Sequence, residues 1–291
     1  MVNEIKVKSI LNKHKKRDEW FLDDYSLNPY QLCAFNCIYC YIRGSKYGEN
    51  MAETLSVKIN APALLERELR ARMRKKEYGF IALSSSTEAW QQIEERYQVT
   101  RKCLEIILRF KFPVHCATKS PLILRDLDLL KEIDKEAILP QDLKDKLNHG
   151  ALITFSFSTL DEEIAKIFEP GAPTPSKRLE TLKKVKDEGF YAGIAFIPVL
   201  PFISDSYEQL DEMIKTAKDV NADYVFVGAL TLFGIGKKLY YKVIEKRFPD
   251  LITKYRKLFR IFSYPSKEYQ ARLESIAKKL CEKYNVKYQI L

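Results

Sequence analysis

The stretch "ALITFSFST" (residues 151–159) is an apolar run that ends in small polar residues, as expected of a buried strand. A charged stretch with helical periodicity follows it, "SKRLETLKKVKDEG" (176–189), and then a second apolar run, "FYAGIAFIPVLP" (190–201). Gly189 marks the end of the helix. A strand, a helix and a strand in this order predict a βαβ unit with parallel strands and a right-handed crossover. This segment therefore predicts an α/β fold.

The same alternation continues on both sides of this unit and adds up to about six βα units. A complete barrel of parallel strands needs eight such units. We therefore predict an open, partial TIM-type barrel, with its functional residues at the C-terminal ends of the strands. Further strands are expected at residues 24–29, 78–87, 112–120 and 222–232, and further helices at residues 61–76, 96–110, 122–134, 140–149 and 206–220.

The chain divides into three regions by composition and pattern. Residues 24–232 carry the alternation and form the predicted barrel core. Residues 1–23 are a basic N-terminal segment, and residues 233–291 are a basic, helical C-terminal extension that we expect to pack on the core. The last stretch, "NVKYQIL" (285–291), has the pattern of an edge strand.

The composition is that of a soluble globular protein with a basic surface. Hydrophobic residues make up 46% and charged residues 30%, and 49 Lys and Arg against 39 Asp and Glu give a net charge of +10. Such a surface is compatible with nucleic-acid binding. No apolar run approaches the ~18 residues that span a bilayer, and the first residues lack the apolar core of a signal peptide. We therefore expect a cytoplasmic monomer that does not contact membranes.

Three cysteines follow the first predicted strand with the spacing C-x3-C-x2-C: Cys33, Cys37 and Cys40. Clustered thiolates bind zinc or iron–sulfur clusters. A closed zinc site needs a fourth ligand, for which His115 and Cys116 are candidates. An iron–sulfur cube held by three cysteines instead keeps one iron open for chemistry. The other cysteines lie in apolar stretches, and we expect them to be buried core residues: Cys103, Cys116 and Cys281.

Polar side chains end the later strands of the predicted barrel. Thr87 and Glu88 end the second strand, Lys119 ends the third and Ser156 lies near the end of the fourth. In a parallel barrel these ends meet at one mouth, beside the cysteines. The alternation of side chains along a strand places Lys119 on the same face as Ala117. A lysine that points inward at a strand end needs an anion, so the mouth is predicted to bind an anionic ligand unless Lys119 forms a surface ion pair.

The cysteine motif resembles that of the radical S-adenosylmethionine enzymes, in which an aromatic residue, here Tyr39, typically precedes the last cysteine. The longer stretch "LNPYQLCAFNCIYCY" (27–41) resembles the spore photoproduct lyase-related branch of that superfamily. The resemblance covers roughly residues 24–260. Its ordered blocks are "SSSTEAWQQIEERYQVTRKCLEI" (84–106), "TKSPLILRDLDLL" (118–130) and "FSFSTLDEEIAKIFEPGAPTPSKRLETLKKVKDEGF" (155–190).

The resemblance implies that Cys33, Cys37 and Cys40 bind three irons of a [4Fe–4S] cluster and that S-adenosylmethionine chelates the fourth. One electron, from a flavodoxin- or ferredoxin-like protein, then cleaves S-adenosylmethionine to a 5′-deoxyadenosyl radical. That radical abstracts a hydrogen atom from the substrate. The cofactors carry this chemistry, and the protein supplies binding, orientation and shielding from water.

The resemblance also implies roles for the residues at the mouth. Thr87 and Glu88 accept hydrogen bonds from the ammonium group of S-adenosylmethionine, although Thr87 is also a good helix N-cap. Lys119 neutralises the carboxylate as a point charge. Ser156 contacts the ribose or the amino acid moiety, or else is a core hydroxyl bonded to the backbone. Tyr39 lies against the adenine, largely through its backbone.

Tyr39 and Tyr41 bracket Cys40, and the matching tyrosines of spore photoproduct lyase are implicated in hydrogen transfer. In that lyase a cysteine near the end of the second strand donates a hydrogen atom, and Ser85 takes its place here. A serine O–H is a far poorer hydrogen-atom donor than a thiol, which argues against repair of a thymine dimer. Trp90 is either a stacking platform or a core residue.

Three basic stretches suit single-stranded or distorted nucleic acid, or else belong to amphipathic helices with ordinary solvated faces: residues 13–17, 67–76 and 237–260. In the second reading, the helices bury Tyr240, Phe248 and Phe259. Glu169 and Arg178 are expected to form a structural ion pair around a proline-rich loop.

We first expect radical chemistry on nucleic acid. The alternatives are the same chemistry on a small molecule or peptide, and a non-catalytic, zinc-stabilised nucleic-acid-binding protein.

Overall fold

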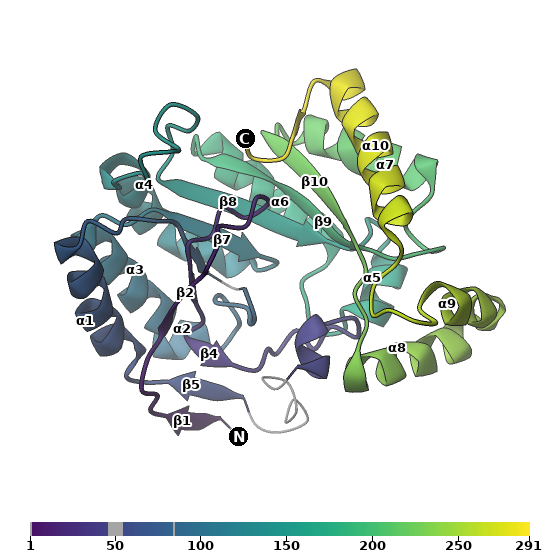
Figure 1. The fold of residues 1–291 in the computed structure, drawn as a ribbon, viewed down its shortest axis with the longest axis horizontal. Helices are drawn as coiled ribbons and strands as arrows, with labels where there is room; N and C mark the ends of the chain where they lie inside the picture. Colours follow the sequence, from purple (N-terminus) through teal and green to yellow (C-terminus); the bar gives the residue numbers. More distant parts are fainter. Residues whose placement is uncertain (1, 46–54, 84) are drawn as a thin grey trace.

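The computed structural model describes residues 2–45, 55–83 and 85–291. Most of its strands lie in one sheet (Figure 1): β2 (Leu11–Lys13), β3 (Tyr25–Leu27), β6 (Ile81–Leu83), β7 (Val114–Thr118), β8 (Ala151–Phe157), β9 (Tyr191–Val199), β10 (Tyr224–Ala229) and β11 (Lys287–Tyr288). Their order is β11-β10-β9-β8-β7-β6-β3-β2. All neighbours are parallel except β2 and β3. Within the described residues the edge strands β2 and β11 do not pair, so the sheet is an open, partial barrel.

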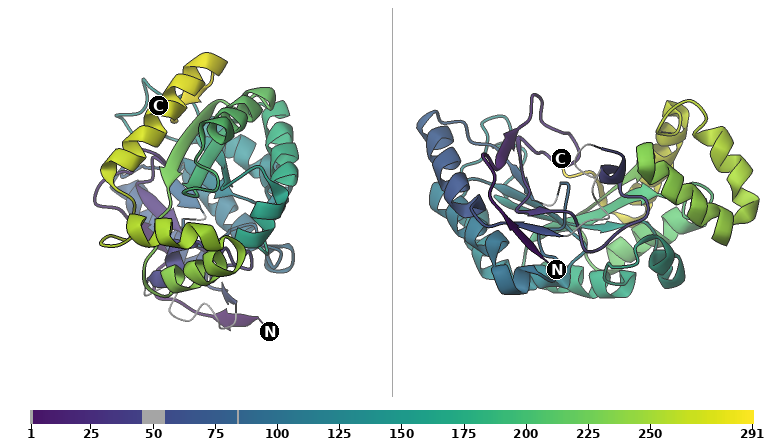
Figure 2. Two further views of the ribbon diagram at one scale, coloured as in Figure 1. Left: turned by 90° about the vertical axis from the view of Figure 1, so that its right-hand side faces the viewer. Right: turned by 90° about the horizontal axis from the view of Figure 1, so that it is seen from below.

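Helices connect these strands and cover the outer, convex face of the sheet (Figure 2). The helices of the barrel are α1 (Ala61–Arg74), α2 (Glu94–Tyr97), α3 (Val99–Phe110), α4 (Leu127–Glu136), α5 (Glu162–Phe168), α6 (Pro175–Asp187) and α7 (Tyr207–Asp219). The C-terminal helices are α8 (Gly234–Arg247), α9 (Ile252–Leu258) and α10 (Lys267–Tyr284). Short 3-10 helices are η1 (Tyr41–Gly44), η2 (Pro121–Asp126) and η3 (Pro249–Leu251).

The sequence-based prediction of an α/β open barrel is confirmed, since the strands β3 and β6 to β10 coincide with the six predicted ones. The predicted edge strand in residues 285–291 is β11, which pairs with β10. The predicted helix at residues 140–149 is wrong, because this segment forms turns. Its Leu143 and Leu147 are buried against the inner face of the sheet, which the turns make possible. The helix predicted at 96–110 is interrupted at Gln98, whose φ of 51° is left-handed.

The hydrophobic core has two main layers on either side of the sheet. The outer layer joins the strands to the helices through fully buried side chains such as Leu83, Ile153 and Ile194. The inner layer lies on the concave face, where Tyr224 and Phe226 of β10 pack with other buried side chains. This inner layer fills the barrel towards the N-terminal ends of the strands. The barrel stays open at their C-terminal ends.

The N-terminal residues add two small features to this frame. β1 (Asn3–Ile5), β4 (Tyr30–Gln31) and β5 (Ser56–Lys58) form a separate sheet in the order β1-β5-β4 beside the barrel (Figure 1). Between β2 and β3, residues 14–23 form a segment that we call the strap.

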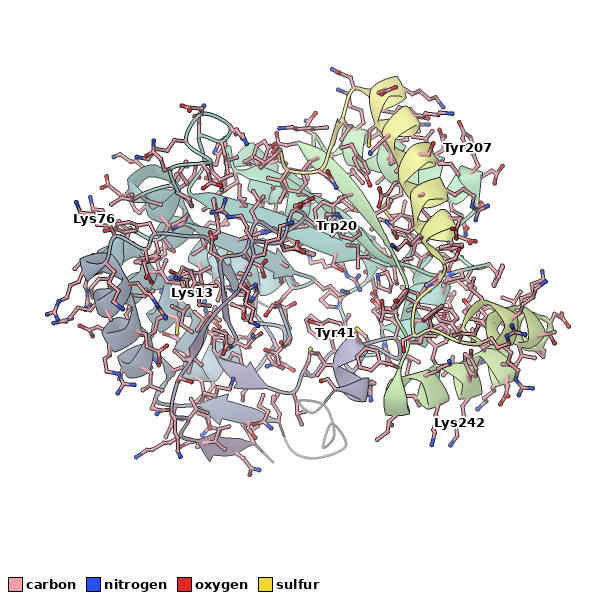
Figure 3. All side chains as sticks on the ribbon, viewed as in Figure 1. Lys13, Trp20, Tyr41, Lys76, Tyr207 and Lys242 are labelled. Atoms are coloured by element: carbon pink, nitrogen blue, oxygen red, sulfur yellow. The ribbon has the colours of Figure 1, made fainter. Side chains whose placement is uncertain are left out.

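The strap crosses the concave face from β3 to β10. Its Phe21 ring meets the Phe226 ring edge-on at 5.3 Å, and its Trp20 ring lies 6.1 Å from the same ring. Any Cβ on Gly228 of β10 would lie 2.8 Å from the Trp20 ring, so only glycine fits there. The strap therefore spans the open side of the barrel, and Trp20 lies over the middle of the sheet in Figure 3.

Candidate active site

A cavity of about 1390 Å³ opens at the C-terminal ends of β6 to β10. Its walls come from the strand ends, from the loop that carries the three clustered cysteines, and from the strap. All the site residues predicted from the sequence line it: Cys33, Cys37, Tyr39, Cys40, Tyr41, Thr87, Glu88, Lys119 and Ser156. The structure thus brings the whole predicted set together in one place.

Cys33, Cys37 and Cys40 are free, half-buried thiols on a tightly turned loop. Asn36 donates its backbone N–H to Cys33 O at 3.3 Å, and Cys40 donates to Cys37 O at 3.2 Å. The buried side chain of Gln91 accepts a hydrogen bond from Ala34 N at 3.0 Å, which ties the loop to the second βα connection. A residue outside the cysteine motif, Gln91, therefore helps to hold the cysteine loop in place.

Burial raises the pKa of the Cys33 thiol to about 11 and that of the Cys37 thiol to about 12. Both thiols are thus protonated at neutral pH unless a metal displaces the proton. In the described part of the chain, no three His, Cys, Asp or Glu side chains converge as ligands of one metal ion. Cysteines that hold different irons of a cluster need not converge on one point.

Thr87 and Glu88 lie side by side but differ in their contacts. The Thr87 hydroxyl is buried and has no hydrogen-bond partner among the described residues, so Thr87 is not a side-chain cap. The Glu88 carboxylate accepts hydrogen bonds from Trp90 N at 3.0 Å, Thr118 Oγ1 at 2.7 Å and Lys119 N at 3.1 Å. Glu88 therefore joins the ends of β6 and β7, and Thr87 offers a free acceptor to a ligand.

Lys119 extends into the cavity from the end of β7. Its Nζ donates to Ser156 Oγ at 2.8 Å, and Ser156 in turn donates to Ile197 O at 3.0 Å. Within the described residues no carboxylate forms an ion pair with Lys119. The alternative of a surface ion pair is therefore not found in this part of the chain. The positive charge of Lys119 lies near Cys37 and within electrostatic reach of Glu88 and Glu169.

Tyr39 is buried, and its hydroxyl donates to the carboxylate of Glu169. Glu169 also accepts a hydrogen bond from Ser158 Oγ at 2.9 Å and forms an ion pair with Arg178, as predicted from the sequence. Arg178 donates further to Pro173 O at 2.8 Å and Ser156 O at 3.0 Å. This buried network anchors the cysteine loop to the end of β8.

Tyr41 is the first residue of η1 and lines the cavity (Figure 3). Its side chain is half-exposed, and its hydroxyl donates to the backbone carbonyl of Ser85. The Ser85 hydroxyl accepts a hydrogen bond from Asn28 Nδ2 at 2.9 Å. The cysteine loop, the first strand and the second strand are therefore linked at this rim.

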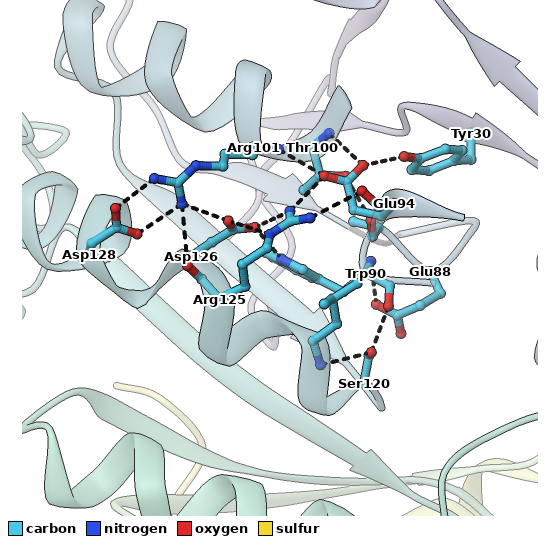
Figure 4. A network of polar contacts seen from close by, with 12 residues as sticks. Tyr30, Glu88, Trp90, Glu94, Thr100, Arg101, Ser120, Arg125, Asp126 and Asp128 are labelled. Carbon is cyan, nitrogen blue, oxygen red and sulfur yellow. Dashed lines mark hydrogen bonds and ion pairs between the residues drawn. The ribbon is translucent and has the colours of Figure 1, made fainter. Parts of the chain in front are cut away.

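Trp90 is a core residue and does not offer a stacking surface. It is fully buried, and its indole N–H donates to Asp126 Oδ2 at 2.9 Å (Figure 4). Asp126 and Glu94 are buried acids that share Arg125, and Arg101 also pairs with Asp126. This charge network fixes the second and third βα connections behind the site.

The two candidates for a fourth zinc ligand are both engaged elsewhere. His115 bonds Phe21 O through Nδ1 at 2.6 Å and Thr154 Oγ1 through Nε2 at 2.5 Å. Burial lowers the pKa of His115 to about 4, so its ring is neutral. Cys116 is a buried core residue, as predicted, and so are Cys103 and Cys281.

The strap is the part of the cavity wall that the sequence prediction missed. His14, Lys15, Lys16, Arg17 and Trp20 all line the cavity. Residues 13–17 are recognisable from the sequence as a basic stretch, but the sequence does not predict where this stretch lies relative to the barrel. The aromatic residues that follow this stretch at positions 20 and 21 were the available signal that the segment packs on the barrel.

Comparison with known proteins now identifies the family. The profile of the Radical SAM superfamily matches residues 27–217, about two thirds of the chain. The chain belongs to the radical SAM superfamily. Members of this superfamily use a [4Fe–4S] cluster and S-adenosylmethionine, and they generally need a reductant.

Among the similar proteins, an uncharacterized protein of Mycobacterium tuberculosis is 27% identical over 268 residues, 90% of this chain and 75% of that protein. An uncharacterized protein of Acidianus two-tailed virus is 27% identical over 257 residues, 80% of each chain. Spore photoproduct lyase, as a mutant with bound AdoMet and dinucleoside spore photoproduct, matches with a TM-score of 0.72 at 17% identity, over 100% of this chain and 81% of that one. SuiB of Streptococcus suis bound to S-adenosylmethionine matches with a TM-score of 0.51 at 16% identity, over 82% and 48%.

These structural similarities establish the radical SAM fold for the chain, and the family match adds the class of chemistry. Among the described residues, no helix combines the length and apolar character needed to cross a bilayer.

Proposed function

We propose that the chain is a radical S-adenosylmethionine enzyme in which Cys33, Cys37 and Cys40 hold a [4Fe–4S] cluster with one open iron. The observation that carries this proposal is the composition of one cavity mouth. It combines three free thiols, a buried hydroxyl with no hydrogen-bond partner among the described residues, and a lysine that forms no ion pair with a described carboxylate. These are the groups that a thiolate-bound cluster and a zwitterionic amino acid ligand require.

When bound and reduced, the cluster would supply one electron to cleave S-adenosylmethionine into methionine and a 5′-deoxyadenosyl radical, which would abstract a hydrogen atom from the substrate. Thr87 Oγ1 accepts a hydrogen bond from the ammonium group of the cofactor. Lys119 Nζ pairs with its carboxylate, and Ser156 positions Lys119 and contacts the ribose or amino acid part. Glu88 lends negative charge near the ammonium group and fixes the backbone of Lys119.

The two tyrosines beside Cys40 have different roles in this proposal. Tyr39 contributes its backbone to the adenine side of the cofactor, because its ring is anchored to Glu169. Tyr41 stands at the cavity rim with its hydroxyl held by Ser85 O, in a position to take part in hydrogen transfer to the substrate. The cavity walls exclude water from the radical.

The test of this function is anaerobic reconstitution with iron and sulfide, reduction with dithionite, and measurement of 5′-deoxyadenosine from S-adenosylmethionine. In the same assay Lys119→Met should weaken cofactor binding by roughly 10- to 100-fold, because a hydrogen bond to a charged group contributes about 1.5–3 kcal/mol. Lys119→Arg keeps the charge and is the matched control. Protein that holds about four irons but forms no 5′-deoxyadenosine contradicts the proposal.

We further propose that the substrate is a nucleic acid. Lys15 and Lys16 of the strap are exposed and line the cavity, and Trp20 lies beside them as an aromatic surface. The cavity is larger than the ~300–1000 Å³ of ordinary small-molecule sites. The fold shared with a lyase that binds a dinucleoside photoproduct supports the same substrate class.

Lys15→Glu/Lys16→Glu should lower the affinity for a single-stranded oligonucleotide on the order of tenfold at low salt and reduce the salt dependence of binding, because fewer phosphates are neutralised. Fluorescence anisotropy over a salt series measures both effects. Lys215→Glu/Lys218→Glu makes the same charge change at exposed positions of α7 and serves as the control. Equal affinity in all three proteins would point to a small molecule or peptide as the substrate.

A further inference from the structure

Most of the net positive charge of the chain lies on two neighbouring helices. Residues 234–260, which contain α8 and α9, hold nine Lys and Arg against two acidic residues, a net charge of +7 out of +10 for the whole chain. Eight of the basic side chains are exposed and define what we call the basic face: Lys238, Lys242, Lys246, Arg247, Lys254, Arg256, Lys257 and Arg260.

Most charges of the basic face have no ion-pair partner within the described part of the chain, and Lys254 lies over the Phe202 ring at 5.7 Å. Among the described residues, the basic face forms one ion pair, between Arg256 and Glu245 at 2.9 Å, and this pair is exposed. Lys242 points away from the body of the molecule (Figure 3). Of the described residues that line the cavity, none belongs to α8. The basic face is therefore separate from the substrate opening and from the strap.

The basic face lies directly behind the cysteine loop. α8 packs against η1, which follows Cys40 without a gap. On its buried side, Tyr240 and Ile244 share a hydrophobic cluster with Cys37 and Tyr39. One helix, about 10 Å across, thus separates the cysteine loop from the basic face.

The inner side of this helix is tightly packed with aromatic rings. Phe168 accepts a hydrogen bond from Ile38 N at 2.8 Å through its carbonyl, and its ring stacks on Tyr240 at 5.3 Å. Tyr240 and Tyr255 are joined by a hydrogen bond of 2.9 Å between their hydroxyls. The contact between the cysteine loop and the helices that carry the charge is therefore made by buried aromatic side chains.

We propose that the basic face docks an acidic one-electron carrier protein of the flavodoxin or ferredoxin type. This inference rests on the proposed function, since only a cluster at Cys33, Cys37 and Cys40 would need such a donor. One electron leaves the reduced carrier, which is oxidised, and reduces the cluster by the same one electron. The cavity side is assigned to cofactor and substrate, so the carrier approaches from behind, where its negative surface complements the basic face.

The aromatic residues favour a protein over a nucleic acid as the occupant of this face. Tyr240, Tyr255 and Phe259 are buried, so these three rings between the basic residues are not available for the stacking on bases by which single-stranded nucleic acid is bound. Exposed Phe262 and Tyr264 stack on each other at 5.7 Å in the loop after α9. They add apolar area at the edge of the face, which suits a small protein interface.

The test uses Lys242→Glu/Lys246→Glu, with Lys215→Glu/Lys218→Glu of α7 as the control for the same charge change. Purified flavodoxin is titrated against each protein at several salt concentrations. The rate at which reduced flavodoxin reduces the reconstituted cluster is then followed by absorbance. We expect the α8 variant to lose affinity and rate on the order of tenfold at low salt. Reduction by dithionite, binding of S-adenosylmethionine and binding of oligonucleotide should stay unchanged.

Equal flavodoxin affinity in wild type and the α8 variant would overturn the inference, as would an absence of binding to the wild type. A loss of oligonucleotide affinity in the α8 variant, with flavodoxin binding intact, would assign the basic face to nucleic acid instead. The titration does not need the cluster. A wild-type chain that binds flavodoxin through this face but holds no iron–sulfur cluster would refute the proposed function and leave the docking surface standing.

Discussion

Cys37→Ala should leave the chain folded but unable to keep an iron–sulfur cluster or to form 5′-deoxyadenosine. Cys37 is a half-buried free thiol in the cavity wall, and alanine removes one of only three proposed thiolate ligands. After anaerobic reconstitution, the wild type should hold about four irons and four sulfides and show the brown colour of a cluster. The variant should hold far less iron, and its product should fall below detection.

The matched control for this experiment is Cys281→Ala in α10. It removes the same atom from a buried thiol that lies outside the cavity, so its iron content and product should equal those of the wild type. Circular dichroism of both variants checks that they are folded. If Cys37→Ala kept the full iron content and the parental rate, the assignment of this thiol would be wrong. Stoichiometric zinc in the wild type, lost in the variant, would favour the structural alternative.

The barrel could be predicted because each of its strands is a short apolar run between charged, helix-period segments. A buried parallel strand leaves this mark in the sequence whatever its neighbours are. The strap leaves no such mark, because its position depends on contacts with residues distant in the sequence, such as those of Trp20 with Gly228 and of Phe21 with Phe226. Residues 140–149 show the converse case: a helix was predicted there, yet the segment forms turns whose Leu143 and Leu147 are buried against the inner face.

In the site, too, features set by the local sequence could be predicted, and features set by contacts between distant residues could not. The cysteine spacing and the inward direction of Lys119 follow from the local sequence, and the structure places these side chains in one cavity. The contacts of Glu88 could not be predicted, because they depend on how the end of β6 meets the end of β7. Trp90 stayed ambiguous until its partner Asp126, 36 positions later, was known.

Arg178→Leu should destabilise the folded chain by about 3–5 kcal/mol, a large part of the about 5–15 kcal/mol that stabilises a typical domain. Arg178 and Glu169 are each about 1% exposed in their side chains, so the variant leaves the carboxylate buried without its counter-ion. The hydrogen bonds from Tyr39 and Ser158 remain, but they do not neutralise the charge. Urea denaturation of the apo chain at pH 7 measures the loss.

The pH dependence should identify the buried charge as the cause. Burial alone would raise the pKa of Glu169, but Arg178 and Lys119 outweigh it and lower that pKa in the wild type. This contribution to stability is present above the pKa of about 4.3 of an unfolded glutamate and is lost as the pH falls below it. Without Arg178 the pKa of Glu169 rises, so the folded variant takes up a proton more readily. The deficit of Arg178→Leu should therefore shrink as the pH falls from 7 towards 4.5.

Glu169→Leu/Arg178→Leu separates lost packing from an unpaired charge. If the unpaired charge is the cause, the double variant should recover a substantial part of the stability lost in Arg178→Leu, because apolar replacement of both partners of a buried ion pair is often close to neutral. It should also lose the pH dependence of the single variant. Additive losses in the two single variants, with no recovery in the double variant, would mean that the guanidinium acts through its bonds to Pro173 O and Ser156 O. In that case Arg178 holds the proline-rich loop, and Glu169 contributes to the cysteine loop through Tyr39 alone.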